Sequence, residues 1–206
     1  MNHYFERGTD PKAPVLVLFH GTGGSELDMV PLAKESSPES TLLSLRGNVR
    51  ENGMPRFFRR LAEGVFDEAD LIFRTQEVYA FLDRAAEEHG LARDRFVAVG
   101  YSNGANIAGS LLFHYRDAFQ GAILHHPMVP LRGMELPALS GIPVFIGAGT
   151  NDPISPVRET EELRDLLAGA GADVALHWER YGHQLTNTEV AAAKGWFHGQ
   201  FAAAEK

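Results

Sequence analysis

The sequence predicts an α/β domain built on a mostly parallel sheet with helices on both faces. Three observations support this prediction. Short apolar runs recur along the chain, stretches with helical periodicity lie between them, and 206 residues suit a single hydrophobic core. When strands and helices alternate in this way, right-handed crossovers place the helices over both faces of the sheet. We therefore expect one domain that spans residues 1–206.

The first expected strand is Val15–Phe19, a continuous apolar run between Pro14 and Gly21. Such a run is typical of a strand that is buried on both faces of a parallel sheet. Similar runs follow at Thr41–Leu45, Phe96–Val99, Ala122–Leu124, Val144–Ile146 and Val174–Trp178. Because ligands of parallel sheets bind at the carboxyl ends of the strands, the residues after each run are candidates for a site.

Helical periodicity is clearest in Leu71–Glu88, Ala105–Tyr115, Val157–Leu167 and Glu189–Phe201. The last of these opens with Thr186-Asn187-Thr188-Glu189, the capping-box pattern in which Thr and Glu side chains satisfy free backbone N–H groups. Residues 46–67 show no clear periodicity. That segment is too long for an ordinary connection, so we expect it to be functional or mobile.

Composition excludes several classes of function. The formal net charge of −8 argues against nucleic acid or anionic lipid as a partner, because the molecule as a whole would repel both. Without cysteine, the chain has no disulfide, no thiolate metal site and no cysteine nucleophile. The N-terminus lacks the apolar core of a signal peptide, and no apolar run approaches the ~20 residues that span a bilayer. We expect a cytoplasmic protein without a membrane span.

Ser102 is the strongest candidate for a nucleophile. It lies in Gly100-Tyr101-Ser102-Asn103-Gly104, between an expected strand and an expected helix. A serine on a tight strand-to-helix turn needs small neighbours, because the turn is strained and the helix approaches the strand closely. Glycine-rich turns are also common as plain connections, so the assignment depends on the flanking strand and helix.

His183 is the candidate base among nine histidines. A serine hydroxyl is a poor nucleophile at neutral pH unless a neutral imidazole lies within hydrogen-bond reach. His183 follows the last expected strand, which puts it on a loop at the ligand-binding edge. His177 lies inside that strand and is better explained as a packed or solvated residue. The helical histidines are His89, His114 and His198, and His20 is expected to fix a loop by hydrogen bonding.

Asp152 is the candidate acid that orients the base. The acid of a triad with this turn follows a strand that lies between the nucleophile and the histidine in chain order. Asp152 lies in the loop after the expected strand Val144–Ile146. An aspartate before a proline is often only a turn residue. The order Ser102, Asp152, His183, with each residue beyond its own strand, favours catalysis.

Two backbone N–H groups are needed to stabilise the carbonyl oxygen as it becomes negative. One would come from Asn103, the residue after the nucleophile. The other would come from Thr22 in the stretch His20-Gly21-Thr22-Gly23-Gly24, directly after the first strand. A glycine-rich stretch can also hold phosphate, but no Lys-Ser or Lys-Thr pair completes a phosphate-binding loop here.

These motifs resemble the carboxylesterase and phospholipase branch of the α/β-hydrolases, which also holds acyl-protein thioesterases and dienelactone hydrolase-like enzymes. The resemblance covers nearly the whole chain, from the glycine-rich stretch at His20 to Gly182-His183. More narrowly, a bacterial subgroup linked to hydroquinone and quinone stress is similar in Leu45-Arg46-Gly47, Glu51-Asn52-Gly53, residues 56–60 and residues 101–106. The resemblance implies the α/β-hydrolase fold and a small intracellular carboxylesterase without a cofactor or metal.

Arginine and phenylalanine gather in residues 46–60 of an otherwise acidic chain. The arginines are Arg46, Arg50, Arg56, Arg59 and Arg60. Arginine binds carboxylates and phosphates in bidentate fashion, and Phe57 and Phe58 could wall an apolar pocket. Most of these arginines are expected to pair with acidic neighbours such as Glu51. We expect residues 46–60 to form one wall of the substrate pocket. Arg46 is the best candidate for contact with substrate, because it directly follows a strand.

His125 and His126 follow the expected strand Ala122–Leu124 and invite comparison with a metal site. Adjacent residues of a strand point to opposite faces, so the pair is not expected to bind one ion. We expect one of them to line the pocket.

The sequence therefore predicts hydrolysis of a small-molecule ester through an acyl-enzyme. About 50 residues separate Ser102 from Asp152, mostly in core elements, which leaves little room for a large lid domain, and we expect none. A thioesterase or lactonase with the same triad is an alternative, as is a binding module without catalysis. The sequence leaves a homodimer open.

Overall fold

A seven-stranded sheet forms the centre of the computed structural model, which describes residues 1–201. Its strands are β1 (His3–Glu6), β2 (Val15–Phe19), β3 (Thr41–Leu45), β8 (Phe96–Tyr101), β9 (Gly121–His125), β10 (Pro143–Gly149) and β11 (Asp173–Glu179). The spatial order is β1-β3-β2-β8-β9-β10-β11, and all neighbours are parallel except β1 with β3. The predicted parallel sheet is confirmed. The edge strand β1 was not predicted, because it is half-buried and lacks an apolar run.

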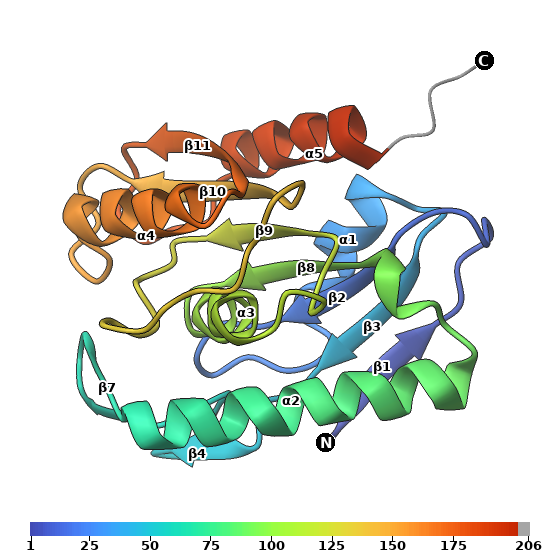
Figure 1. Cartoon of the computed structure of the whole chain (residues 1–206), viewed down its shortest axis with the longest axis horizontal. Coiled ribbons are helices and arrows are strands. Elements are labelled where there is room, and N and C mark those ends of the chain that lie inside the picture. Colours follow the sequence, from blue (N-terminus) through green and yellow to red (C-terminus); the bar gives the residue numbers. More distant parts are fainter. Residues whose placement is uncertain (202–206) are drawn as a thin grey trace.

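Helices cover both faces of this sheet (Figure 1). They are α1 (Val30–Ser36), α2 (Glu68–His89), α3 (Asn103–His114), α4 (Val157–Gly169) and α5 (Asn187–Phe201), with a short 3-10 turn at Arg93–Arg95. One hydrophobic cluster joins the sheet to α2, α3 and α4, and a second joins it to α1 and α5. The four predicted helices are present. Sequence periodicity missed α1, since seven residues make only about two turns.

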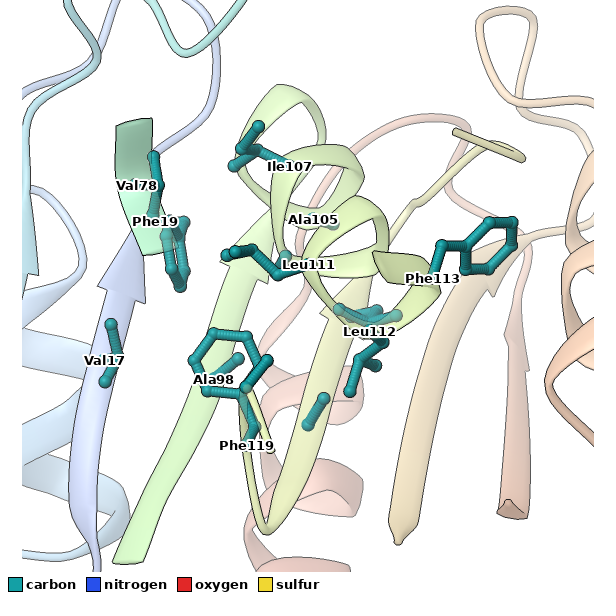
Figure 2. Packing of buried hydrophobic residues seen from close by; sticks show 14 of the residues in the cluster. Val17, Phe19, Val78, Ala98, Ala105, Ile107, Leu111, Leu112, Phe113 and Phe119 are labelled. Atoms are coloured by element: carbon teal, nitrogen blue, oxygen red, sulfur yellow. The ribbon is translucent and has the colours of Figure 1, made fainter. Parts of the chain in front are cut away.

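The helix α3 packs closely against the central strands. Figure 2 shows Val17, Phe19 and Ala98 of the sheet beside Ala105 and Leu111 of this helix. All five side chains are fully buried. Because only Ser102 lies between the end of β8 at Tyr101 and the start of α3 at Asn103, this packing fixes the position of the turn that carries Ser102.

The segment without periodicity folds as two small hairpins. They are β4 (Val49–Glu51) with β5 (Met54–Arg56), and β6 (Arg60–Ala62) with β7 (Val65–Phe66). The first turns at Asn52 and Gly53, both at positive φ, as the Asn-Gly pair favours. No part of residues 1–201 forms a large lid over the sheet. Among the helices of these residues, none is long and apolar enough to cross a membrane.

Candidate active site

Ser102 lies on a sharp turn between β8 and α3, at the carboxyl edge of the sheet. Its φ of 53° is strained for a residue other than glycine, and its N–H donates to the carbonyl oxygen of His125 at 2.9 Å. The two flanking glycines leave no room for a side chain. A Cβ on Gly100 would lie 2.7 Å from the Gly104 carbonyl oxygen, and one on Gly104 would lie 2.1 Å from the Phe19 carbonyl oxygen. The sequence motif thus has a steric basis.

The structure brings together the three side chains predicted to act on substrate. His183 Nε2 lies 2.7 Å from Ser102 Oγ, and His183 Nδ1 lies 2.6 Å from Asp152 Oδ2. Both distances are those of hydrogen bonds, which therefore link Asp152 to His183 and His183 to the Ser102 hydroxyl. The loop that carries His183 is tied down by Tyr101, whose hydroxyl donates to the His183 carbonyl at 2.6 Å, and by Asn151, whose Oδ1 accepts from the Gly182 N–H.

Asp152 is buried, and all of its acceptor capacity is used. Its Oδ1 accepts from the N–H groups of Ile154 and Ser155 at 2.8 and 3.0 Å, while Oδ2 faces both His183 and His126. Burial alone would raise the pKa of Asp152. Hydrogen bonds from His126, His183 and Ser155 outweigh that effect and hold the pKa well below its usual range, so the carboxylate is ionised at neutral pH.

The glycine-rich loop after β2 is held by side chains on either side of it. His20 Nδ1 donates to the Gly21 carbonyl at 2.6 Å, and His20 Nε2 accepts from the Gly47 N–H at 3.1 Å. This pattern fixes a neutral ring, and burial lowers the pKa of His20. His20 therefore has the loop-fixing role expected of it, and Thr22 and Asn103 both line one cavity with Ser102.

That cavity has a volume of about 310 Å³ and opens beside the Ser102 hydroxyl. This size suits a small ligand. Its apolar lining comes from Phe66, Met128 and Ile154, and its cationic lining from Arg56 and Arg60. The sequence did not single out any of these five as a contact, although Arg56 and Arg60 belong to residues 46–60, the segment expected to form one wall of the pocket.

The substrate contacts expected of Arg46, Phe57 and Phe58 need correction. Arg46 pairs with Glu26 through its Nε, and its Nη2 lies 2.9 Å from Glu26 Oε1, away from the cavity lining. Phe57 and Phe58 are fully buried in the core. The expectation failed because the chain turns into a hairpin after β3, which points the two rings inward. The same segment brings Arg56 and Arg60 to the cavity.

Arg56 and Arg60 share one acidic partner. Glu51 Oε2 lies 3.2 Å from Arg56 Nη1, and Glu51 Oε1 lies 3.0 Å from Arg60 Nε. Arg56 also donates to Thr22 Oγ1 at 2.9 Å, which braces the glycine-rich loop. Because one carboxylate serves two guanidinium groups, this wall keeps an excess of positive charge. The pairing with Glu51 was expected, and so was a pocket wall formed by residues 46–60, but Arg46 rather than these two arginines was the expected contact.

His125 and His126 are both buried, and neither lines the cavity beside Ser102, so the expected pocket role is wrong. Both rings contact Glu189 of α5 instead. The capping box is only half formed for this reason. The Glu189 N–H donates to Thr186 Oγ1 at 3.1 Å, but its carboxylate points into the core rather than back to the helix terminus.

His126, Asp152 and His183 also form a group whose ligand-type atoms lie within 4.8 Å of one another. Their atoms already have partners. Both Nδ1 atoms face Asp152 Oδ2, His183 Nε2 faces Ser102, and His126 Nε2 faces Glu189. Hydrogen bonds within the described residues therefore account for this group without an ion.

His177, the other candidate base, pairs with Glu179 at 3.0 Å on the edge strand.

Comparison with known proteins gives matches over nearly the whole chain. Residues 2–198 match the family model described as Phospholipase/Carboxylesterase. The chain is 56% identical over 197 residues to MhqD of Bacillus subtilis (strain 168), which is named a hydrolase, and covers 98% of it. That alignment takes in 96% of this chain.

Solved structures agree. A Bacillus cereus carboxylesterase superposes with a TM-score of 0.97 at 62% identity, covering 98% of this chain and 95% of that one. YahD, solved with malic acid, superposes with a TM-score of 0.93 at 31% identity, covering 97% of this chain and 98% of that one. These likenesses confirm the α/β-hydrolase fold without a large lid domain.

Proposed function

The chain belongs to the phospholipase/carboxylesterase family of α/β-hydrolases, and from this premise we propose that it is a serine carboxylesterase with Ser102 as nucleophile. As a member of the family it is a carboxylic ester hydrolase. The observation that carries the proposal is the unbroken line of hydrogen bonds from Asp152 through His183 to Ser102. A serine so placed has an acceptor for its proton and an anion that orients that acceptor.

In the proposed reaction, His183 Nε2 takes the Ser102 proton as Oγ attacks the ester carbonyl. The developing oxyanion is stabilised by the N–H groups of Thr22 and Asn103. His183 then passes its proton to the leaving alcohol, and an acyl group remains on Ser102. Water activated by His183 attacks that acyl group, which releases the acid and restores the serine. Asp152 stays ionised and holds the ring with Nδ1–H toward itself.

The lining of the cavity supports a small ester that carries a carboxylate. Arg56 and Arg60 offer two guanidinium groups near the nucleophile. Glu51 pairs with both, but its single negative charge balances only one of their two positive charges. Glu63 also lines the cavity but is exposed, so solvent screens its charge. The 31% identical YahD, which was solved with the dicarboxylate malic acid, supports the same class of ligand.

A thioesterase or lactonase would use the same groups, and a binding module would not use the serine at all. Labelling with a fluorophosphonate distinguishes the three hydrolases from a binding module, because only an activated serine reacts. We expect the wild-type protein to be labelled at Ser102, and Ser102→Ala to fold normally yet lose labelling and ester hydrolysis. Turnover of p-nitrophenyl acetate at the wild-type rate by folded Ser102→Ala would reject the proposal.

Asp152→Asn tests the acid separately. We expect it to reduce turnover on the order of 10⁴-fold, because the amide favours the wrong imidazole tautomer. A matched panel of p-nitrophenyl esters, thioesters and lactones then ranks the substrate classes. A cytoplasmic location, a homodimer and a single domain over residues 1–206 stay predictions.

A further inference from the structure

Behind Asp152, on the side away from Ser102, lies a buried cluster of titratable side chains that the proposed hydrolysis does not use. It consists of His125 and His126 at the end of β9 and Glu189 in the first turn of α5, none more than 1% exposed. His126 Nδ1 lies 3.0 Å from Asp152 Oδ2, and His126 Nε2 lies 3.0 Å from Glu189 Oε2. Glu189 Oε1 lies 2.5 Å from His125 Nδ1.

The backbone holds His126 in this place at a cost. Its φ of 51° is a left-handed conformation that disfavours a side chain, and its N–H donates to the Gly147 carbonyl at 2.7 Å. Gly147 in turn makes room for the carboxylate, since a Cβ there would lie 2.0 Å from Glu189 Oε1. The strained backbone of His126 and the missing side chain of Gly147 therefore both allow the contact between His126 and Glu189.

The hydrogen bonds fix the charge of the ring. Both nitrogens of His126 face carboxylate oxygens, which accept but do not donate when ionised. A neutral imidazole donates from only one nitrogen, so two such bonds require the doubly protonated cation. Burial alone would lower the pKa of His126, but hydrogen bonds to Asp152 and Glu189 outweigh it and raise the pKa to about 9. Burial would likewise raise the pKa of Glu189, yet its bonds to His125 and His126 lower it to about 2.

Titratable groups reach His126 from each element packed against it. Asp152 follows β10, Glu189 comes from α5, and Tyr101 of β8 lies with its ring centroid 6.0 Å away. The ring of His183, from the loop after β11, lies 5.2 Å away, and His125 lies beyond Glu189. Of these groups, His183 decides catalysis, because a protonated ring cannot accept the Ser102 proton. A neighbouring cation disfavours that second positive charge.

Given the proposed function, on which this inference rests, we propose that His126 is a positioning residue of the hydrolysis. Its imidazolium ring holds the Asp152 carboxylate behind His183 and places a positive charge beside the ring that must accept the Ser102 proton. Asp152 Oδ2 thus serves two histidines, one that takes up a proton during the reaction and one that stays charged throughout.

The test is the acid limb of kcat/KM against pH for p-nitrophenyl acetate in His126→Asn. Asparagine tolerates the left-handed backbone and carries no charge. We expect the limb to move to higher pH by about one unit, because a unit charge about 5 Å from His183 has been removed. The control is His177→Asn, which removes a histidine paired with a glutamate elsewhere on the sheet, and it should leave the limb in place.

Glu189→Gln provides a second variant of nearly unchanged shape, which decides the matter if His126→Asn does not fold. The glutamine amide can donate to His126 Nε2, so the ring no longer needs a second proton and becomes neutral. The limb should then move to higher pH as in His126→Asn, but less far, because the anion lost with Glu189 lies on the side of His126 away from Asp152. An unmoved limb in the folded variants, with activity lowered at every pH, would overturn the proposal and leave the cluster a structural one. Fluorophosphonate labelling of the wild-type protein is run in parallel. Its failure would instead reject the proposed serine mechanism.

Discussion

Arg59 and Arg60 are neighbours in sequence, yet only Arg60 reaches the cavity beside Ser102. Arg59 is 63% exposed at its side chain and pairs with Asp67 and Asp70 on the other side of the hairpin. Position on a hairpin, rather than residue type, therefore decides which arginine can meet a substrate. Arg59 directly precedes β6 and Arg60 is its first residue, so the two arginines are a natural comparison.

We expect Arg60→Gln to lower kcat/KM for mono-p-nitrophenyl succinate by about tenfold or more, the usual size of a lost charged hydrogen bond. The neutral p-nitrophenyl butyrate, with an acyl chain of the same length, should be nearly unaffected. Arg59→Gln should change neither ester. A parallel decline of both esters in Arg60→Gln, with a lowered melting temperature, would show that Arg60 serves only to hold the hairpin.

At the residue scale, the sequence supplied candidates that follow strands and missed those that depend on a turn or on burial. Ser102, Asp152 and His183 each follow a strand directly or closely, so chain order brings them to one edge. The expected contact of Arg46 with substrate was wrong because composition does not predict the path of the chain after β3. Glu189 was hidden within a capping pattern, and only burial shows that its carboxylate turns inward.

At the scale of elements, the close approach of α3 to β2 depends on Gly104. We expect Gly104→Ala to destabilise the protein by about 1–3 kcal/mol, because a Cβ only 2.1 Å from the Phe19 carbonyl must push the helix away. Ester hydrolysis should fall further, since Ser102 moves with α3. Gly195→Ala in α5 is the control. A Cβ there meets nothing within 4 Å, so this change should stabilise by up to about 1 kcal/mol. Urea unfolding measures both, and equal effects would contradict the steric argument.

The elements themselves were predicted where burial leaves a simple pattern. All six apolar runs are strands, and each of the long helices contains its predicted core. The structure adds β1, α1 and the two hairpins, which are short or half-buried and therefore carry little periodicity. The Asn52-Gly53 pair was the one local signal that could have revealed the first hairpin.

For the whole molecule, the buried charges predict a stability that depends on pH in both directions. Asp152 and Glu189 have lowered pKa values when folded, so they stabilise above about pH 4.5 and this contribution is lost as the pH falls toward 2. His126 has a raised pKa, so its contribution is complete below about pH 6.5 and is lost as the pH rises through 9. We expect the melting temperature to be highest between about pH 5 and 6.5.

Differential scanning calorimetry from pH 3 to pH 10 checks this profile. His126→Asn should lose the alkaline decline. Its acidic decline should weaken but remain, because His126 is only one of the groups that lower the pKa values of Asp152 and Glu189. A wild-type melting temperature that stays constant between pH 6 and pH 10 would contradict the assignment of a buried imidazolium.

The order of the strands also protects Ser102 and His183 unequally against local unfolding. Ser102 follows β8, with three strands on either side, whereas His183 follows β11, the half-buried last strand of the described sheet. Edge strands open at a lower free-energy cost than central ones, and their amide hydrogens exchange with solvent sooner. A brief opening of β11 would carry the base away from a nucleophile that stays folded. The Tyr101 hydroxyl donates to the His183 carbonyl from the central strand β8, so this opening must break that hydrogen bond, which therefore opposes it.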